Sequence, residues 1–267
     1  MNIAIVTGAS SGMGREFVLQ LSQYVQVDEI WAIARREEAL KSLESTVPVR
    51  PVVLDLCENS SFVAFAQLLE TEKPNVKLLV NAAGFGKFGS YYKVPLEDDL
   101  RMIDLNCKAL VAMTRLTLPY MTAGSHVLQL ASNSSWQPVP YITTYGATKA
   151  MVLSYSRAMN RELKASGIRM MSMNPGWGRT EFFNHALQTN ADGEVCYYDR
   201  IYEAKDVVAT GLRDLYKTKK DFSIHGLPVR LQVKLVKLLP HSFVMNTWLN
   251  QQKKAKNNAN LTVEERK

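Results

Sequence analysis

Tyr145 and Lys149 stand four residues apart in the run Tyr-Gly-Ala-Thr-Lys, and Ser132 lies upstream of both. Positions i and i+4 share one face of a helix, so a helix here would bring the ammonium near the phenol. A neighbouring ammonium favours the phenolate and lowers the pKa of a tyrosine from its ordinary value of about 10. Such a phenol can give a proton to a carbonyl oxygen or take one from an alcohol. The spacing alone is common on surface helices, so the prediction depends on the motifs around it.

A short apolar run at residues 3–6 leads into a glycine-rich turn at residues 7–14, Thr-Gly-Ala-Ser-Ser-Gly-Met-Gly. Apolar residues spaced for one helical face follow, so the order is strand, glycine turn, helix. Glycines let the backbone approach a pyrophosphate, and the amino end of a helix offers free N–H groups. Gly12 and Gly14 are one residue apart, which departs from the general G-x-G-x-x-G spacing. The order of elements nevertheless predicts a dinucleotide site.

The second expected strand, residues 29–34, ends at Arg35 and Arg36. An acidic residue at this point accepts hydrogen bonds from the ribose 2′-hydroxyl of NAD, whereas an arginine suits the 2′-phosphate of NADP. Ala34 is neutral and no acid stands at this strand end, so the sequence predicts NADP, with Arg35 as the first choice for the 2′-phosphate and Arg36 as the second. The alternative is that both arginines merely open a solvated helix.

Together these motifs resemble the short-chain dehydrogenase/reductase family over residues 1 to about 185. The turn at residues 7–14 is similar to the family's cofactor turn, with Met13 where isoleucine is commoner. Asp55 is similar to the aspartate that meets the adenine. Residues 81–84, Asn-Ala-Ala-Gly, are similar to an Asn-Asn-Ala-Gly motif in which Ala82 replaces the second asparagine. Residues 174–176, Asn-Pro-Gly, and Thr180 are similar to the segment that closes over the nicotinamide.

The resemblance implies a catalytic set of Asn106, Ser132, Tyr145 and Lys149. Tyr145 would be the general acid and base, and Lys149 would also hold the nicotinamide ribose. Ser132 would bind the substrate oxygen, with Ser134 as the second choice for that role. Asn106 would hold a water that links Lys149 to solvent. The residues expected at NADP are Gly8, Ser10, Ser11, Gly12, Met13, Gly14, Arg35, Arg36, Asp55, Leu56, Asn81, Ala82, Gly84, Tyr145, Lys149, Pro175, Gly176, Gly178 and Thr180.

Strand and helix patterns alternate along the chain, which predicts βαβ units and a parallel sheet with helices on both faces. The fold class is therefore α/β, with a single doubly wound, Rossmann-type sheet and a C-terminal amphipathic helical extension. Strands are expected near residues 3–7, 29–34, 50–54, 77–81, 126–131 and 168–173. Helices are expected near residues 13–24, 36–44, 59–71, 97–121 and 142–166. The motifs fall at strand ends, where such sheets bind ligands.

One domain is expected over residues 1–250, with a substrate lid at 181–225 and an amphipathic extension at 226–250. The aromatic residues of the lid would either face a flat apolar substrate or pack the lid on the sheet, and the sequence leaves both open. They are Phe182, Phe183, Tyr197, Tyr198 and Tyr202.

In the extension, Leu231, Leu235 and Leu238 define an apolar helical face among basic residues. We expect that face to be buried against the protein, near the lid or a subunit boundary. Membrane contact is the less favoured alternative, because Pro240 limits the helix to a few turns. The polar, basic residues 251–267 are expected to be loosely ordered.

The composition sets limits on the class of protein. Apolar residues make up 46% of the 267 residues, which suits one globular domain. A first strand at residue 2 or 3 leaves no room for a signal peptide, and no apolar run is long enough to span a bilayer. Three scattered cysteines and four isolated histidines predict no metal site and a reducing cytoplasm. Residues 226–267 hold most of the net charge of +7 but lack interleaved aromatics, so no nucleic-acid partner is expected.

The expected function is NADP(H)-dependent interconversion of a secondary alcohol and a ketone. The aromatic lid favours a bulky apolar substrate, such as a hydroxysteroid or bile acid. The protein would then be a bacterial hydroxysteroid dehydrogenase. The alternatives are a 3-oxoacyl or unspecialised ketone reductase, a membrane-associated accessory enzyme acting on acyl or cell-envelope substrates, and a cofactor-binding protein without turnover. A homodimer or homotetramer is expected.

Overall fold

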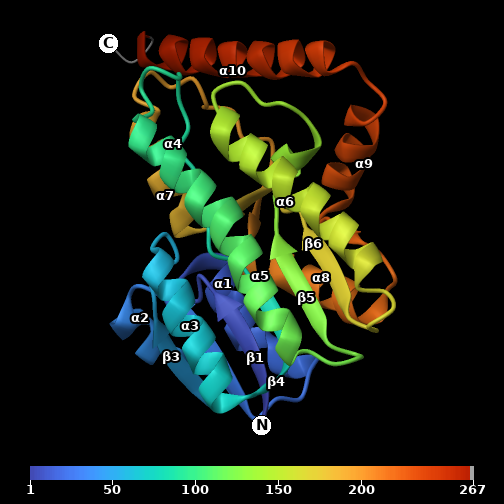
Figure 1. Ribbon diagram of the computed structural model, residues 1–267. Coiled ribbons are helices and arrows are strands. Elements are labelled where there is room, and N and C mark those ends of the chain that lie inside the picture. The colour runs from blue at the N-terminus through green and yellow to red at the C-terminus, as the bar shows by residue number, and fades with distance from the viewer. Residues whose placement is uncertain (265–267) are drawn as a thin grey trace.

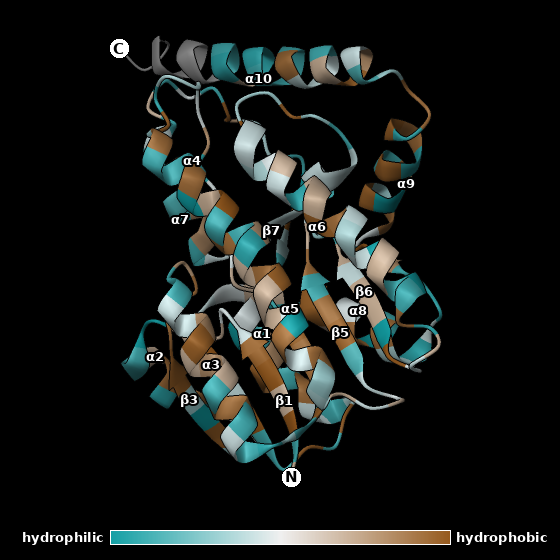
Figure 2. Cartoon of the chain, viewed as in Figure 1, coloured by the Kyte–Doolittle hydropathy of each residue, from teal (hydrophilic) through white to brown (hydrophobic). Residues whose placement is uncertain are grey.

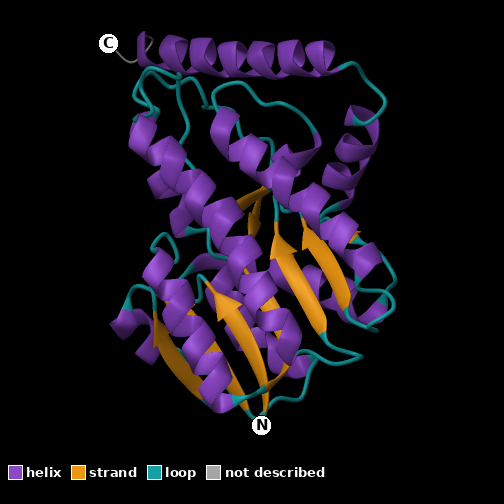
Figure 3. Cartoon of the chain, in the orientation of Figure 1, coloured by secondary structure: helices purple, strands orange, loops and turns teal. Residues whose placement is uncertain are grey.

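The computed structural model describes the backbone of residues 1–264 and the side chains of residues 1–258. Its centre is a seven-stranded sheet in the order β3-β2-β1-β4-β5-β6-β9, and every neighbouring pair is parallel (Figures 1 and 3). The strands are β1 Asn2–Thr7, β2 Glu29–Ala34, β3 Val49–Val53, β4 Asn75–Asn81, β5 His126–Leu130, β6 Arg169–Met173 and β9 Phe222–Ser223. The predicted doubly wound parallel sheet is confirmed.

Helices cover both faces of the sheet, as the continuous apolar strands require. The helices up to the lid are α1 Gly12–Gln20, α2 Glu37–Lys41, α3 Asn59–Glu72, α4 Leu96–Ile103, α5 Leu110–Thr117 and α6 Thr143–Glu162. The later ones are α7 Glu181–Ala186, α8 Ala204–Lys217, α9 Leu227–Val236 and α10 His241–Glu264. Side chains of β1 alternate between two core clusters, Ala4 and Val6 on one face and Ile3 and Ile5 on the other.

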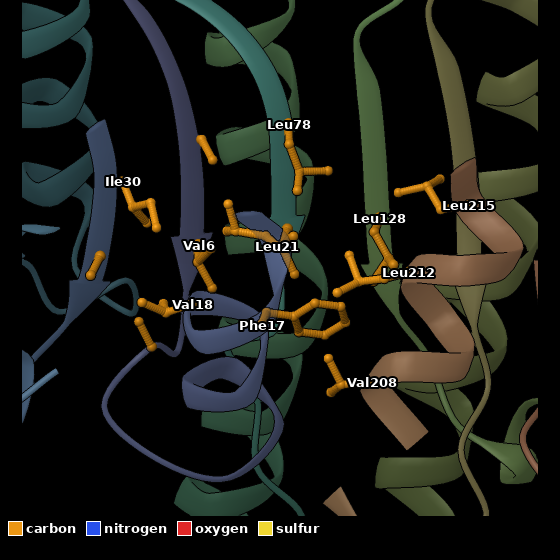
Figure 4. Packing of buried hydrophobic residues seen from close by; sticks show 14 of the residues in the cluster. Val6, Phe17, Val18, Leu21, Ile30, Leu78, Leu128, Val208, Leu212 and Leu215 are labelled. Atoms are coloured by element: carbon orange, nitrogen blue, oxygen red, sulfur yellow. The ribbon is translucent and has the colours of Figure 1, made fainter. Parts of the chain in front are cut away.

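The core on one face is built mainly by α1 and α8 (Figure 4). Phe17 of α1 and Leu21, which follows the end of α1, are fully buried and share one cluster with Val208 and Leu212 of α8. Burial of side chains of this size stabilises the fold by about 1.5–3 kcal/mol each. This contact fixes the start of α1, and with it the glycine turn, against the end of β1.

Several boundaries differ from the prediction. The single helix expected at 97–121 is interrupted by a π-helix, Asp104–Ala109, between α4 and α5. The helix expected at 36–44 covers only Glu37–Lys41. Within the stretch 181–225, expected as the substrate lid, α8 and β9 continue the alternation of helix and strand. Its β8, Ile201–Glu203, also pairs with β7, Trp177–Arg179, in a small parallel sheet.

The C-terminal extension consists of two helices, α9 and α10, separated at Pro240, rather than one. The expected burial of its leucines is wrong, because Leu231, Leu235 and Leu238 are 56%, 57% and 83% exposed. The buried side chains of α9 are instead Val229, Val233 and Val236.

The physical reason is that α9 has two apolar faces. Its valine face is the one that packs, because Val229 and Val233 form a cluster with Ile224 and contact Trp136 and Phe222. The leucines lie on the other side, and Figure 2 shows hydrophobic colour on this short helix.

The segment expected to be loosely ordered is also different in the structure. The helix α10 continues to Glu264 and lies across one end of the molecule, over the ends of α4 and α6 (Figure 1). Residues 265–267 lie outside the described residues. Within the described part of the chain, no helix is long and apolar enough to cross a membrane.

Candidate active site

The glycine turn between β1 and α1 forms one wall of a cavity of about 580 Å³. Gly8 has a φ of 68°, and a Cβ added there would lie 2.8 Å from the Cα of Ala83. A Cβ on Gly14 would collide with the carbonyl of Gly8. Glycine at these two positions therefore permits the tight packing of the turn, and residues at the start of α1 line the cavity. This cradle fits a phosphate of the predicted dinucleotide.

Most of the predicted site residues line this one cavity. Those that do are Gly8, Ser10, Ser11, Gly12, Met13, Gly14, Arg35, Arg36, Asp55, Leu56, Ala82, Gly84, Ser132, Ser134, Tyr145, Lys149, Pro175, Gly176, Gly178 and Thr180. They come from the carboxyl ends of β1, β2, β3, β4, β5 and β6 and from α6. Because parallel strands end at the same edge, the topology brings these distant segments together. Asn81 and Asn106 are not among the lining residues.

Asn81 lies beneath the cavity, inside the core. Its Nδ2 donates to Oγ1 of Thr114 and to Oε1 of Gln129, both at 3.0 Å. Thr7 of β1 accepts a hydrogen bond from the N–H of Ala83 at 3.1 Å. The Asn81 side chain therefore anchors the end of β4, and the residues after it reach the cavity.

Asn106 is fully buried within the π-helix. Its amide donates to the carbonyl of Phe85 at 2.9 Å and to Oγ1 of Thr148 at 3.0 Å, and its Oδ1 accepts from the N–H of Phe85 at 3.0 Å. A Cβ on Gly84 would lie 2.8 Å from this Oδ1 and 3.3 Å from Nζ of Lys149. The π-helix thus places Asn106 beside the lysine, and its water-holding role stays a prediction. Single turns of π-helix are often found at functional sites.

The two arginines after β2 have different partners. Arg35 forms an ion pair with Asp55, with Nη1 3.7 Å from Oδ2. Arg36 lies over the glycine turn, where its Nη2 donates to Oγ of Ser10 at 3.3 Å and to Glu181 at 3.1 Å. A guanidinium beside a hydroxyl at the end of β2 is a suitable site for a phosphate.

The serine cluster follows β5 as a short 3₁₀ helix, Asn133–Trp136, capped by Ser132. The Oγ of Ser132 accepts the N–H of Ser134 at 3.2 Å, and interaction with the Ser132 side chain lowers the pKa of Tyr145, against the larger effect of burial. Ser135 donates to the carbonyl of Lys149 at 2.8 Å, which ties this turn to α6. The hydroxyl of Ser134 is buried and has no partner among the described residues. The contact with Tyr145 favours Ser132 over Ser134.

Tyr145 and Lys149 lie on α6, as the spacing predicted, but their interaction differs from the prediction. The Nζ of Lys149 donates to the carbonyl of Leu130 at 2.8 Å and lies 5.6 Å from the centre of the Tyr145 ring. Burial lowers the pKa of Lys149 to about 8. Burial also raises the pKa of Tyr145 to about 12, and interaction with the Ser132 side chain offsets only part of that rise. The expected lowering of the tyrosine pKa by Lys149 is therefore wrong for this arrangement.

Aromatic side chains surround the phenol. Phe182 of α7 lies with its ring centre 5.3 Å from that of Tyr145, and Phe88 lies at 6.0 Å. A Cβ on Gly86 would come within 3.0 Å of both Tyr145 and Phe182, so the glycine permits this close packing. These rings form an apolar wall beside Tyr145.

The aromatic lid divides between the two roles that the sequence left open. Phe182, Phe183 and Tyr197 line the cavity, whereas Tyr198 packs against Trp177 and Tyr202 packs against His225. The lining residues that sequence reasoning missed include Phe88, Val139, Ile142, Trp248 and Gln251. The last two come from α10, far from any recognised motif, and only their helical spacing near the chain's end could have drawn attention to them. Among the described residues, no cluster of histidine, cysteine and acidic side chains could hold a metal ion.

Comparison with known proteins identifies the family that the sequence motifs resemble. The sequence model of the short chain dehydrogenase family matches residues 2–191. The chain is 28% identical to a probable short-chain type dehydrogenase/reductase, VdlC, of Helicobacter pylori, over 90% of this chain and 94% of that protein. It is 29% identical to the NADP-dependent 3-hydroxy acid dehydrogenase YdfG of Escherichia coli K12, over 89% and 94% of the two chains.

A solved structure extends the likeness to three dimensions. The short-chain dehydrogenase from Sphingobium yanoikuyae in complex with NADPH has a TM-score of 0.75 and 25% sequence identity. The match covers 88% of this chain and 92% of that one.

Proposed function

We propose, from the premise that this chain belongs to the short-chain dehydrogenase family, that it interconverts a secondary alcohol and a ketone with NADP(H). The observation that carries the proposal is the convergence of Ser132, Tyr145 and Lys149 on the cavity that the glycine turn also lines. One side chain there can move a proton, and the hydride must come from a bound dinucleotide.

The chain is an oxidoreductase, and NADP is the cofactor that its residues fit. The glycine turn would hold the pyrophosphate, and Arg36 with Ser10 would hold the 2′-phosphate. Arg35 would lie over the adenine side, beside Asp55. Similarity to the NADP-dependent YdfG and to a dehydrogenase in complex with NADPH supports the same cofactor.

Bound NADP(H) supplies or accepts the hydride, and the side chains of this protein control the proton. Burial keeps Tyr145 protonated at neutral pH, so the phenol is ready to donate its proton to a ketone oxygen as reduction proceeds. Ser132, whose side chain interacts with Tyr145, orients that oxygen and stabilises the charge that develops on it.

Lys149 contributes a positive charge below the site. Its ammonium is held by the carbonyl of Leu130 and lies near Gly84 and Asn106. From there it lies within the proposed ribose site. A buried lysine whose pKa is about 8 is also able to lose its proton and so restore the phenol.

For the substrate, we propose a bulky apolar ketone or alcohol, of which a hydroxysteroid or bile acid is the leading example. Aromatic side chains at Tyr145 support this class, since Phe88 and Phe182 exclude water and present flat faces. A 3-hydroxy acid or 3-oxoacyl substrate is the second candidate. Lys87 and Arg101, which also line the cavity, and the similarity to YdfG favour it.

A substrate panel tests the proposal. Purified protein with NADPH or NADH is given oxosteroids, 3-oxoacyl thioesters and small ketones, and the loss of reduced nicotinamide absorbance is followed. We expect NADPH-dependent turnover with the highest kcat/KM for a polycyclic ketone. Highest activity on the thioesters would favour the second candidate. NADPH binding with no turnover of any carbonyl compound would contradict the proposal.

We also propose a homodimer or homotetramer in the cytoplasm. Leu96, Leu100 and Ile103 on α4 are exposed apolar side chains, and the three cysteines are free thiols. Light scattering after gel filtration measures the assembly directly.

A further inference from the structure

The helix α10 lies across one end of the molecule, over the lid and the segment before α6 (Figure 1). The family's sequence model ends at residue 191, well before this helix begins. Three residues of α10 relate it to the cavity, and they are Trp248, Gln251 and Gln252.

Gln252 attaches the helix to the lid. It is only 4% exposed, and its Oε1 accepts the backbone N–H groups of Cys196 and Tyr197, both at 2.8 Å. The thiol of Cys196 donates in return to the backbone carbonyl of Gln252 at 3.4 Å. One side-chain carbonyl therefore holds two consecutive lid amides, next to a tyrosine that lines the cavity.

Trp248 attaches the helix to the other wall. Its Nε1 donates to the carbonyl of Pro140 at 3.1 Å, and its ring stacks on Trp177 with centres 6.4 Å apart and an angle of 23° between planes. Pro140 lies between the lining residues Val139 and Ile142, and Trp177 belongs to β7 of the lid sheet. The indole thus joins two walls that are distant in sequence.

Trp248 and Gln251 both line the cavity themselves. Gln251 is exposed, and within the described part of the chain its amide has no hydrogen-bond partner, so it is free to bind a ligand. The indole offers a flat apolar surface, and the amide offers a donor and an acceptor one helical turn away.

We propose that α10 forms a substrate subsite for a fused-ring or similarly bulky carbonyl compound that carries a hydrogen-bonding group away from the reacting carbon. Trp248 contacts the ring body, and Gln251 binds the polar group. Gln252 is a positioning residue that holds the lid, through Cys196 and Tyr197, in the shape that completes the subsite. The inference rests on the proposed function and names the part of the site that selects for size.

The selectivity follows from contact. A small ketone that reaches Tyr145 leaves Trp248 untouched, whereas a polycyclic ketone is large enough to touch both. Loss of the indole should therefore affect only the large substrate, by an amount typical of a lost apolar contact in a specificity pocket, about 10-fold to 200-fold.

The first experiment compares cyclohexanone with a 3-oxosteroid bearing a distant hydroxyl, using NADPH. Trp248→Ala should raise KM for the oxosteroid about tenfold or more and leave kcat/KM for cyclohexanone within about twofold. Gln251→Ala should do the same for the hydroxylated steroid but not for its deoxy analogue. Asn250→Ala, on the exposed side of α10, is the matched control and should change neither. Equal effects on both ketones, or no effect of Trp248→Ala, would overturn the subsite.

The second experiment tests Gln252 by rescue. Gln252→Ala removes the acceptor of two N–H groups, whereas Gln252→Glu keeps an oxygen that can accept both. The alanine variant should raise KM for the oxosteroid with kcat for cyclohexanone retained, and the glutamate variant should restore KM toward the parent value. A general loss of turnover with a lowered melting temperature in both variants would indicate a merely structural role and contradict the proposal.

Binding without turnover separates this inference from the proposed function. Calorimetric titration of the 3-oxosteroid into the parent protein with NADP⁺ should show binding that Trp248→Ala weakens about tenfold or more. If no ketone is reduced but this difference holds, the subsite stands and the proposed reaction fails. If ketones are reduced and the oxosteroid binds both proteins equally, the reaction stands and the subsite is wrong.

Discussion

Arg36 donates a hydrogen bond to the hydroxyl of Ser10 at 3.3 Å, and this contact joins the end of β2 to the glycine turn. The neighbouring Arg35 turns instead to Asp55 at the end of β3. Sequence alone had pointed to Arg35 as the first choice for the 2′-phosphate, with Arg36 as the second. The two arginines therefore occupy different positions, and mutation of each one can test its role in binding the 2′-phosphate.

Arg36→Ala should weaken NADPH binding about tenfold to a hundredfold and leave NADH binding nearly unchanged. The reason is that a charge-assisted hydrogen bond to a phosphate contributes about 1.5–3 kcal/mol. Calorimetric titration of both cofactors measures the ratio. Arg35→Ala is the matched comparison, and we expect it to shift the ratio less. If only Arg35→Ala changes it, the phosphate is held by Arg35.

Tyr145→Phe should lower kcat by about 10²–10⁴-fold while NADPH still binds, because the variant loses the proton donor but keeps the ring. Single-turnover kinetics and fluorescence titration of NADPH separate the two quantities. A variant that reduces its best ketone at the parent rate would show that another group supplies the proton.

Ser132→Ala should lower kcat about 10²–10³-fold, the usual cost of removing a donor to a developing oxyanion. Ser134→Ala should have a much smaller effect, because Ser132 is the serine whose side chain interacts with Tyr145. Steady-state rates of both variants on one ketone decide the matter. A reversed order would transfer the role to Ser134.

Val233→Asp should lower the free energy of unfolding by about 3 kcal/mol or more, since it buries an unpaired charge against Trp136 and Phe222. Leu235→Asp, on the exposed face of the same helix, should change it by less than about 0.5 kcal/mol. Urea unfolding of both variants gives the comparison. Loss of stability in Leu235→Asp would mean that another copy or segment covers the leucines, and lost vesicle co-sedimentation at unchanged stability would identify a membrane contact.

Stability should fall between pH 6.5 and pH 4 because of His126. Burial, helped by the nearby charge of Arg169, lowers the pKa of this histidine from 6.5 to about 4. Between these two values the histidine is protonated in the unfolded chain but neutral in the folded protein. The free energy of unfolding therefore falls as the pH falls through this window, and it has its full value above pH 6.5.

The loss at pH 5 should be about 1–2 kcal/mol, allowing for partial exposure of the ring. His126→Phe keeps a ring against Tyr216, whose centre lies 4.4 Å away, and should remove this part of the pH dependence. Urea unfolding at pH 7.5 and pH 5 tests both proteins, with the other histidines common to each. An unchanged pH dependence in the variant would assign it elsewhere.

Some site features could not be predicted from the sequence because they depend on partners far along the chain. Asn81 follows the expected motif, yet its side chain bonds Thr114 and Gln129, which stand 33 and 48 positions away. The pKa of Tyr145 was predicted from one neighbour four residues distant, but burial among Phe88 and Phe182 outweighs that neighbour. The spacing of residues along the chain predicts which side chains share a helix face, but it does not predict how deeply the fold buries them.

The sequence by itself determined the parallel sheet and the position of the site on it. Buried apolar runs alternating with helical patterns allow few other topologies, and motifs at the ends of parallel strands must meet at one edge. Only the tertiary structure decided which face of α9 is buried, where α10 lies, and that Gln252 holds the lid. The leucine and valine faces of α9 are both apolar, so periodicity could not choose between them. The choice came from Trp136 and Phe222, brought beside that helix by the fold.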